Sequence, residues 1–145
     1  MNEIIYTVFR TEQLIESGEY EGYKFAIFNY GLNPAAYVGI PDGHPFRGNR
    51  RLVQTMIQCH GGITFMENFR GAISRKNAPH LVEVFGNQFV IGWDYAHYGD
   101  FMPALALCRA GKVWTTEEIF EEVKDVIEQL KSVVINNDEK GEING

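Results

Sequence analysis

The chain has few cysteines and no long hydrophobic run. Its two cysteines, Cys59 and Cys108, lack CxxC spacing, which argues against a thioredoxin-like motif or a zinc knuckle and favours reduced thiols. No apolar stretch approaches the roughly 20 residues of a membrane-spanning helix, and the residues after Met1 do not combine a basic region with a long apolar run. We therefore expect a cytoplasmic protein without a membrane partner.

Basic residues are also scarce, since 13 lysines and arginines stand against 19 aspartates and glutamates and the net charge is −6. General nucleic-acid binders and proteins that bind anionic membranes rely on a broad basic face. The sequence therefore argues against both classes, while a local basic pocket remains compatible with it.

The length of 145 residues and the hydrophobic content of 45% are those of one globular domain. Aromatic residues make up 13% of the chain, which favours a strand-rich core or a stacking pocket. We predict a single domain over residues 1–145. Residues 136–145 are polar and contain glycine, and we expect them to form a flexible tail.

Runs of β-branched and aromatic residues predict strands at Ile4–Phe9, Tyr23–Tyr30 and Ala35–Ile40, the last two forming a hairpin. Thr11–Gly18 is interpreted as a short helical turn or loop, and Met56–Phe65 as a strand interrupted by two glycines. Residues 67–79 are expected to form a variable connection. The strongest hairpin signal consists of two apolar runs, His80–Phe85 and Gln88–Trp93, joined by two turn residues.

A long helix is predicted near the end of the chain. Thr115 or Thr116 can cap it, with Glu118 completing a capping box, and the helix should run to about Val134. Apolar residues recur at helical spacing on one broad face: Ile119, Phe120, Val123, Val126, Ile127, Leu130, Val133 and Val134. The predicted fold class is α+β, with an antiparallel sheet built from hairpins and packed against this helix.

Three of the four histidines, His44, His60 and His97, lie in turn-rich segments flanked by glycine. His44 belongs to a loop over residues 41–48 that contains two prolines, and Asp94 and Asp100 flank His97. Because rigid scaffolds commonly present reactive groups on loops, the clustering predicts one polar site.

In one hypothesis this site is catalytic. His60 and His97 would work with Asp94 or Asp100 in a hydrolase, since imidazole titrates near neutral pH and a carboxylate can fix its second nitrogen. The candidate metal ligands are His60, Asp94 and His97, although their spacing matches no standard metalloenzyme signature and the sequence requires no cofactor. Histidines bonded to backbone carbonyls and aspartates that cap turns are the structural alternatives.

In the other hypothesis the site binds a small anionic ligand. Guanidinium groups suit phosphate oxygens, glycine amides can hold an anion, and aromatic rings can stack on a base. The residues assigned to the ligand are His44, Arg47, Arg50, Gly61, Gly62, Trp93 and Tyr95. A tight turn is the structural alternative for the glycine pair, and core or surface positions are the alternatives for the others.

Three strings, Ala36–Pro45 with its His-Pro pair, Cys59–Phe65 with Cys-His-Gly-Gly, and Gly92–Asp100, resemble a family of small uncharacterised proteins of tailed bacteriophages and prophages. The resemblance covers roughly Tyr23 to the terminal helix. This chain departs from it before Tyr23 and in the loop with Arg47, Arg50 and Arg51, where the relatives are more acidic. The family has no established activity that the resemblance could imply for this chain. The resemblance implies a viral accessory protein in the host cytoplasm, with counter-defence against a host nucleotide signal as a natural role.

Binding and sequestration of a cyclic or ADP-ribose-type nucleotide is the function we favour from the sequence. The basic loop, the aromatic residues and the phage resemblance favour it, whereas the grouped histidines and aspartates favour the hydrolase. A third hypothesis is an inhibitor that covers another protein, which an exposed apolar patch on a hairpin edge would favour. A homo-oligomer is compatible with each hypothesis.

Overall fold

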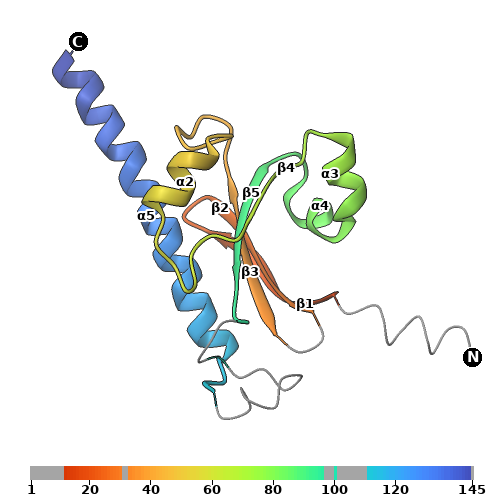
Figure 1. Ribbon diagram of the computed structural model, residues 1–145. Helices are drawn as coiled ribbons and strands as arrows, with labels where there is room; N and C mark the ends of the chain where they lie inside the picture. Colours follow the sequence, from red (N-terminus) through yellow and green to blue (C-terminus); the bar gives the residue numbers. More distant parts are fainter. Residues whose placement is uncertain (1–11, 31–32, 97–99, 101–110, 145) are drawn as a thin grey trace, which may run out of the picture.

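The computed structural model describes residues 12–30, 33–96, 100 and 111–144 (Figure 1). Five strands form one antiparallel sheet in the order β1-β2-β3-β5-β4. The strands are β1 (Glu12–Tyr20), β2 (Tyr23–Tyr30), β3 (Pro34–Ile40), β4 (Phe65–Asn68) and β5 (Phe89–Asp94). The helices are α2 (Arg50–Met56), α3 (Ala72–Asn77), α4 (Pro79–Phe85) and α5 (Thr116–Asn144). This arrangement confirms the predicted α+β class.

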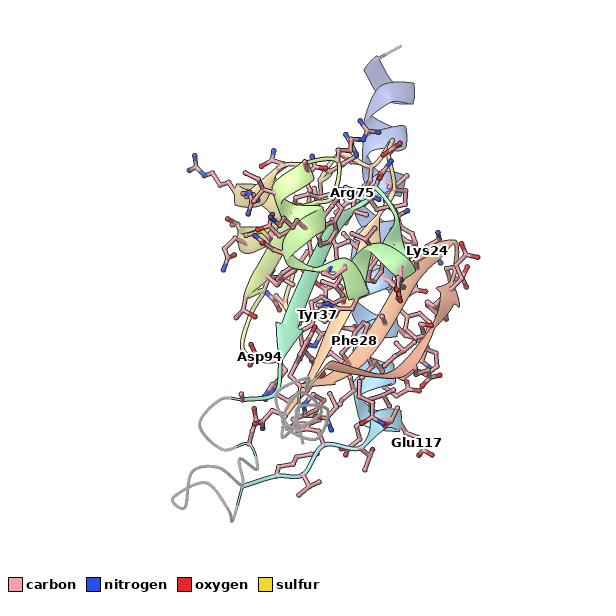
Figure 2. All side chains as sticks on the ribbon, turned by 90° about the vertical axis from the view of Figure 1, so that its right-hand side faces the viewer. Lys24, Phe28, Tyr37, Arg75, Asp94 and Glu117 are labelled. Carbon is pink, nitrogen blue, oxygen red and sulfur yellow. The ribbon has the colours of Figure 1, made fainter. Side chains whose placement is uncertain are left out.

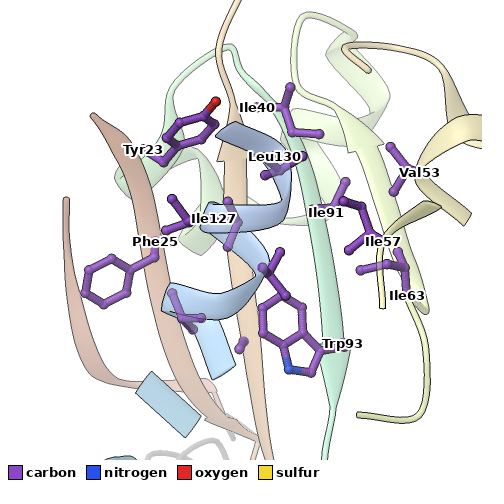
Figure 3. Close-up of a cluster of buried hydrophobic side chains, with 14 of the residues drawn as sticks. Tyr23, Phe25, Ile40, Val53, Ile57, Ile63, Ile91, Trp93, Ile127 and Leu130 are labelled. Atoms are coloured by element: carbon purple, nitrogen blue, oxygen red, sulfur yellow. The ribbon is translucent and has the colours of Figure 1, made fainter. Parts of the chain in front are cut away.

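The sheet lies between two helical layers. The long helix α5 crosses one face, and the short helices α3 and α4 cover the other (Figure 1). The core against α5 includes Trp93, Ile127 and Leu130 (Figure 3), whereas the core against α4 includes Phe28 and Phe85. Both faces of the central strands are therefore buried.

The pleat of β5 determines on which face of the sheet each of its side chains lies. Ala36 and its cross-strand partner Trp93 belong to the core under α5. Tyr37, which pairs with Gly92, belongs to the core under α4. Since successive strand residues alternate between faces, Asp94 follows Gly92 to the α4 side and Trp93 lies on the α5 side.

Local signals that involve only neighbouring residues gave correct predictions. β2 and β3 pair as the expected hairpin. The capping box is present, because the Glu118 carboxylate accepts from the Thr115 amide at 3.1 Å and the Thr115 hydroxyl accepts from the Glu118 amide at 3.1 Å. The apolar stripe of α5 is buried against the sheet at Ile119, Val123, Val126, Ile127 and Leu130.

The expectation of a helical turn or loop at Thr11–Gly18 is wrong. These residues lie largely in β1, which pairs with β2 from Glu12 to Tyr20 with a bulge between Leu14 and Glu16. Glu21 and Gly22 make the connecting turn with φ values of 52° and 84°. A polar edge strand carries little signal of its own, because it forms through hydrogen bonds to its neighbour. The predicted strand at Ile4–Phe9 lies outside the described residues.

Two further strand predictions are corrected. The segment Met56–Phe65 contains the end of α2 and an irregular loop, and strand β4 begins only at Phe65. His80–Phe85 forms helix α4 rather than half of a hairpin, with Pro79 at its first turn and Gly86 at its C-cap with φ of 64°. Leu81 and Phe85 lie four residues apart and are both buried, so helical packing outweighs the strand preference of the valines. The connection predicted at residues 67–79 contains α3.

Helix α5 continues to Asn144, past the predicted end near Val134. Whether residues 136–145 move as a tail stays a prediction. Among the helices of the described ranges, none combines the length and the apolar composition that a membrane crossing needs.

Candidate functional site

His60 and Asp100 meet in space although the chain separates them by 40 residues. The imidazole Nε2 lies 2.8 Å from Asp100 Oδ2, with 23% of the His60 side chain and 3% of the Asp100 side chain exposed. His60 occupies a turn in which the Gly62 amide donates to the Cys59 carbonyl at 3.0 Å. Gly61 and Gly62 have φ values of 70° and 79°, which suit glycine, so the glycine pair shapes the turn that presents His60.

Two aromatic rings contact the imidazole. The Tyr95 ring is parallel to it, with centroids 4.9 Å apart and planes 8° apart, and the Trp114 ring lies 4.8 Å away at a tilt of 57°. Asp100 also accepts from the indole Nε1 of Trp114 at 2.8 Å, so one carboxylate holds both His60 and Trp114.

A second carboxylate completes a partly buried polar network. Glu122 on α5 accepts from the His60 backbone amide at 3.0 Å and from the Tyr95 hydroxyl. The Tyr95 oxygen accepts in turn from Trp93 Nε1 at 3.0 Å. Burial first, and then the bond to Glu122, raise the pKa of Tyr95, so its phenol stays protonated and donates. The network joins β5, α5, the loop before β4 and Asp100.

A pocket of about 250 Å³ borders this network near the beginning of α5. Its lining contains Ile15, Ile27, Asn29, Tyr95, Lys112 and Trp114 among others. Tyr95 and Trp114 line the pocket, whereas His60 and Asp100 are not among its lining residues. The histidine and aspartate therefore support the aromatic wall rather than face the pocket.

The structure separates Asp94 from this cluster. Asp94 lies on the α4 side of the sheet, where Thr64 Oγ1 donates to one carboxylate oxygen at 3.1 Å and the Ala96 amide to the other at 3.1 Å. The expectation that Asp94 joins His60 in one site is therefore wrong, because the pleat of β5 directs it to the other face. His97 lies outside the described residues.

His44 is held by the backbone. Its Nδ1 accepts from the Phe46 amide at 2.9 Å, and its Nε2 lies 2.8 Å from the Leu130 carbonyl, so it attaches the loop over residues 41–48 to α5. Burial lowers the pKa of His44, which favours the neutral ring that these two bonds require. Leu130 lies eight residues beyond Glu122, about 12 Å along the helix, so His44 does not join the His60 cluster.

The arginines also lie away from the pocket. Arg47 pairs with Asp42 at 2.9 Å, and Arg50 donates to the Met66 carbonyl at 2.8 Å. The backbone amide of Arg47 donates to the His44 carbonyl, and the His44 side chain contacts α5 at Leu130. Leu130 and the pocket residue Ile119 are about 16 Å apart along the helix axis. Arg51 is exposed on α2. These arginines therefore do not share a binding site with Tyr95, contrary to the prediction.

Other predicted groups have structural positions. Trp93 is 1% exposed in the core, and Gly61 and Gly62 do not line the pocket. Burial first, and then the charge of Glu122, raise the pKa of Cys59 to about 12, so its thiol is a poor nucleophile. Within the described part of the chain, no group of three or more histidine, cysteine or acidic side chains is placed to hold a metal ion.

Sequence reasoning missed Trp114, Glu122, Lys112 and Asn29. Trp114 directly precedes the capping box of α5 in the sequence. Glu122 lies one residue before the buried Val123, on the border of the apolar face. This border position is a signal for a partly buried acid, although it does not identify its partners.

Comparisons of the chain with protein-family models, with curated proteins and with solved structures give no match.

Proposed function

We propose that this protein binds and sequesters a small anionic, nucleotide-like ligand in the pocket beside Tyr95 and Trp114. The observation that carries the proposal is that the pocket wall combines the aromatic ring of Trp114 with the positive charge of Lys112. Lys112 Nζ lies 4.3 Å from the centre of the Trp114 ring. A planar base can contact the rings while a phosphate meets the ammonium.

Lys112 is already oriented by an acidic neighbour. Its Nζ lies 2.6 Å from Glu118, which belongs to the capping box of α5. An ammonium has three donors, so the pair with Glu118 leaves further donors for a phosphate. The helix cap thereby positions the only basic side chain in the described pocket lining.

Asn29 supplies a polar contact for the ligand. Its side-chain oxygen Oδ1 is buried and has no hydrogen-bond partner, and the residue lines the pocket. A buried acceptor without a donor costs about 1–3 kcal/mol. A ligand N–H, such as the exocyclic amine of a base, would satisfy it.

The geometry favours binding over hydrolysis. A general base must lie within hydrogen-bond reach of the proton it abstracts. His60 contacts Tyr95 and Trp114. In the described part of the chain, these two rings line the pocket and the His60 imidazole does not. The hydrolase with His60 and Asp100 therefore remains the second outcome of the test.

The pocket volume limits the ligand. About 250 Å³ lies below the usual range of roughly 300–1,000 Å³ for drug-sized ligands. This favours a mononucleotide, cyclic or linear, over a larger ADP-ribose-type molecule. Phage origin, a counter-defence role and homo-oligomerisation remain proposals, and the motif resemblance is the support for the first two.

The test incubates the protein with adenosine monophosphate, its cyclic form and ADP-ribose. The filtrate and the heat-released fraction are then analysed by mass spectrometry, with and without chelator. We expect depletion of a mononucleotide followed by its intact release. Products in the filtrate would instead establish an enzyme, and the absence of both depletion and products would favour a protein partner.

Two matched substitutions locate the site. Lys112→Gln removes the cation in the pocket and should weaken retention about tenfold or more. Arg47→Gln removes an equal charge from the distant loop and should leave retention unchanged. The reverse pattern would contradict the pocket and restore the arginine loop as the binding site.

A further inference from the structure

A second pocket lies on the opposite face of the sheet, at the end of β5. It has a volume of about 280 Å³, and its lining includes Tyr30, Tyr37, Phe65, Thr64 and Asp94. Figure 2 views this face, with Tyr37 and Asp94 labelled below α4. The sheet separates this pocket from the one beside Trp114, so the two can be tested independently.

In this pocket the Tyr37 ring stands at a steep angle to the rings of both Tyr30 and Phe65. The Tyr37 and Phe65 rings have centroids 5.3 Å apart and planes at 89°, and the Tyr30 and Tyr37 rings have centroids 6.4 Å apart and planes at 80°. A cation is attracted to the face of such a ring within about 6 Å. Walls that meet nearly at right angles suit a rounded ammonium better than a flat guanidinium, which stacks on parallel planes.

Gly92 makes room for this arrangement. It pairs with Tyr37 on one side and with Phe65 on the other. A Cβ at this position would lie 2.6 Å from Tyr37 Cδ1, so only glycine lets the ring take its place. The position of Tyr37 is therefore fixed by the sheet.

Hydrogen bonds orient both phenol groups. The Tyr30 oxygen lies 2.8 Å from the Tyr37 oxygen and 2.8 Å from His80 Nε2. Burial, the bond to Tyr30 and the negative charge of Asp94 all raise the pKa of Tyr37 far above its ordinary value. Tyr37 therefore presents a neutral ring to the pocket.

Asp94 gives the pocket its charge. No lysine or arginine lines the pocket within the described ranges, and Asp94 is its one acidic lining residue there. Thr64 and the Ala96 amide hold the carboxylate in place. The net charge of −6 further favours approach of a cation.

We propose that this pocket binds an alkylated ammonium group, with the faces of Tyr30, Tyr37 and Phe65 around the cation and Asp94 as its counter-charge. The alkylated ammonium can belong to a free small molecule or to a methylated lysine side chain, since both carry the same cationic group.

Calorimetric titration of the full chain tests the proposal. The probes are tetramethylammonium, choline and the neutral isostere of choline in which carbon replaces nitrogen, all at matched salt. We expect saturable binding of both ammonium probes and at least about tenfold weaker binding of the isostere. A trimethyllysine peptide and its unmethylated form then distinguish the two sources of the head group. Failure of all ammonium probes to saturate, or equal binding of choline and its isostere, would overturn the proposal.

Substitutions assign the binding to this pocket. Asp94→Asn should weaken choline binding about tenfold, and Phe65→Leu several-fold, because these changes remove the counter-charge and one ring face. Glu117→Gln removes one acidic charge from the first turn of α5 and is the control for net charge. Binding unaffected by Asp94→Asn would contradict the assignment. Lys112→Gln should leave choline binding intact, which separates this proposal from the nucleotide pocket.

Discussion

The imidazole of His60 lies flat against the ring of Tyr95, and each ring is held by its own carboxylate. Asp100 contacts His60 Nε2 at 2.8 Å, and Glu122 accepts from the Tyr95 hydroxyl. Two acids thus hold the stacked pair in place. Because Tyr95 lines the pocket, this network determines the shape of the wall that we propose for ligand binding.

Removal of the Tyr95 hydroxyl should destabilise the fold without removing the ring. In Tyr95→Phe, Trp93 Nε1 loses its acceptor inside the core, and a buried unsatisfied donor costs about 1–3 kcal/mol. Urea denaturation measures this change in the free energy of unfolding. The matched control is Tyr20→Phe, which removes an exposed hydroxyl bonded to Glu128 on the same helix and should be nearly neutral. Equal effects of the two substitutions would refute the role of the buried Trp93–Tyr95 hydrogen bond.

The turn that carries His60 depends on glycine at position 62. Gly62 has φ of 79°, and a Cβ there would meet no atom within 4 Å, so Gly62→Ala tests the backbone alone. We expect a loss of about 1–2 kcal/mol in the free energy of unfolding. Gly43→Ala also adds a Cβ in open space, at a residue without a positive φ, and should be nearly neutral. A neutral Gly62→Ala would show that the turn tolerates another conformation.

Asp100 should determine the tautomer of His60. Trp114 Nε1 can only donate, so in Asp100→Asn the amide oxygen must face the indole and the amide N–H₂ must face the imidazole. His60 Nε2 would then become an acceptor and its proton would move to Nδ1. Histidine side-chain NMR of the two proteins measures this change. A His60 Nε2 that remains protonated in Asp100→Asn would contradict the assigned hydrogen bonds.

The parts of the fold that sequence could predict were those set by near neighbours. The apolar stripe of α5 and the Thr115–Glu118 capping box each depend on residues three or four apart. β1 could not be predicted in this way, because its polar residues form a strand only by pairing with β2. In α4, local strand preference pointed to the wrong structure, since the packing of Leu81 and Phe85 against the sheet is a tertiary effect.

The candidate site shows the same limit. His60 was recognised from its glycine turn, and its pairing with an acid was anticipated, but two acids were candidates. The pleat of β5 sends Asp94 to the far face, and Asp100 is the acid that reaches His60. Arg47 and Tyr95 were assigned to one site because of their chemistry alone. The sequence did not indicate that the loop of Arg47 and Tyr95 would contact α5 at positions far apart along the helix, Leu130 and Glu122.

His44 should make stability depend on pH. Burial lowers its pKa in the folded protein, and its Nδ1 must accept from the Phe46 amide, so protonation opposes folding. This contribution is complete above the unfolded value of about 6.5 and is lost as pH falls below it towards the folded pKa. We expect the free energy of unfolding to fall on acidification in that window, with a slope from this group of at most about 1.4 kcal/mol per pH unit. In His44→Asn, whose side-chain oxygen can still accept from Phe46, this part of the slope should disappear. Urea denaturation at several pH values compares the two proteins, and equal slopes would show that His44 does not titrate with folding.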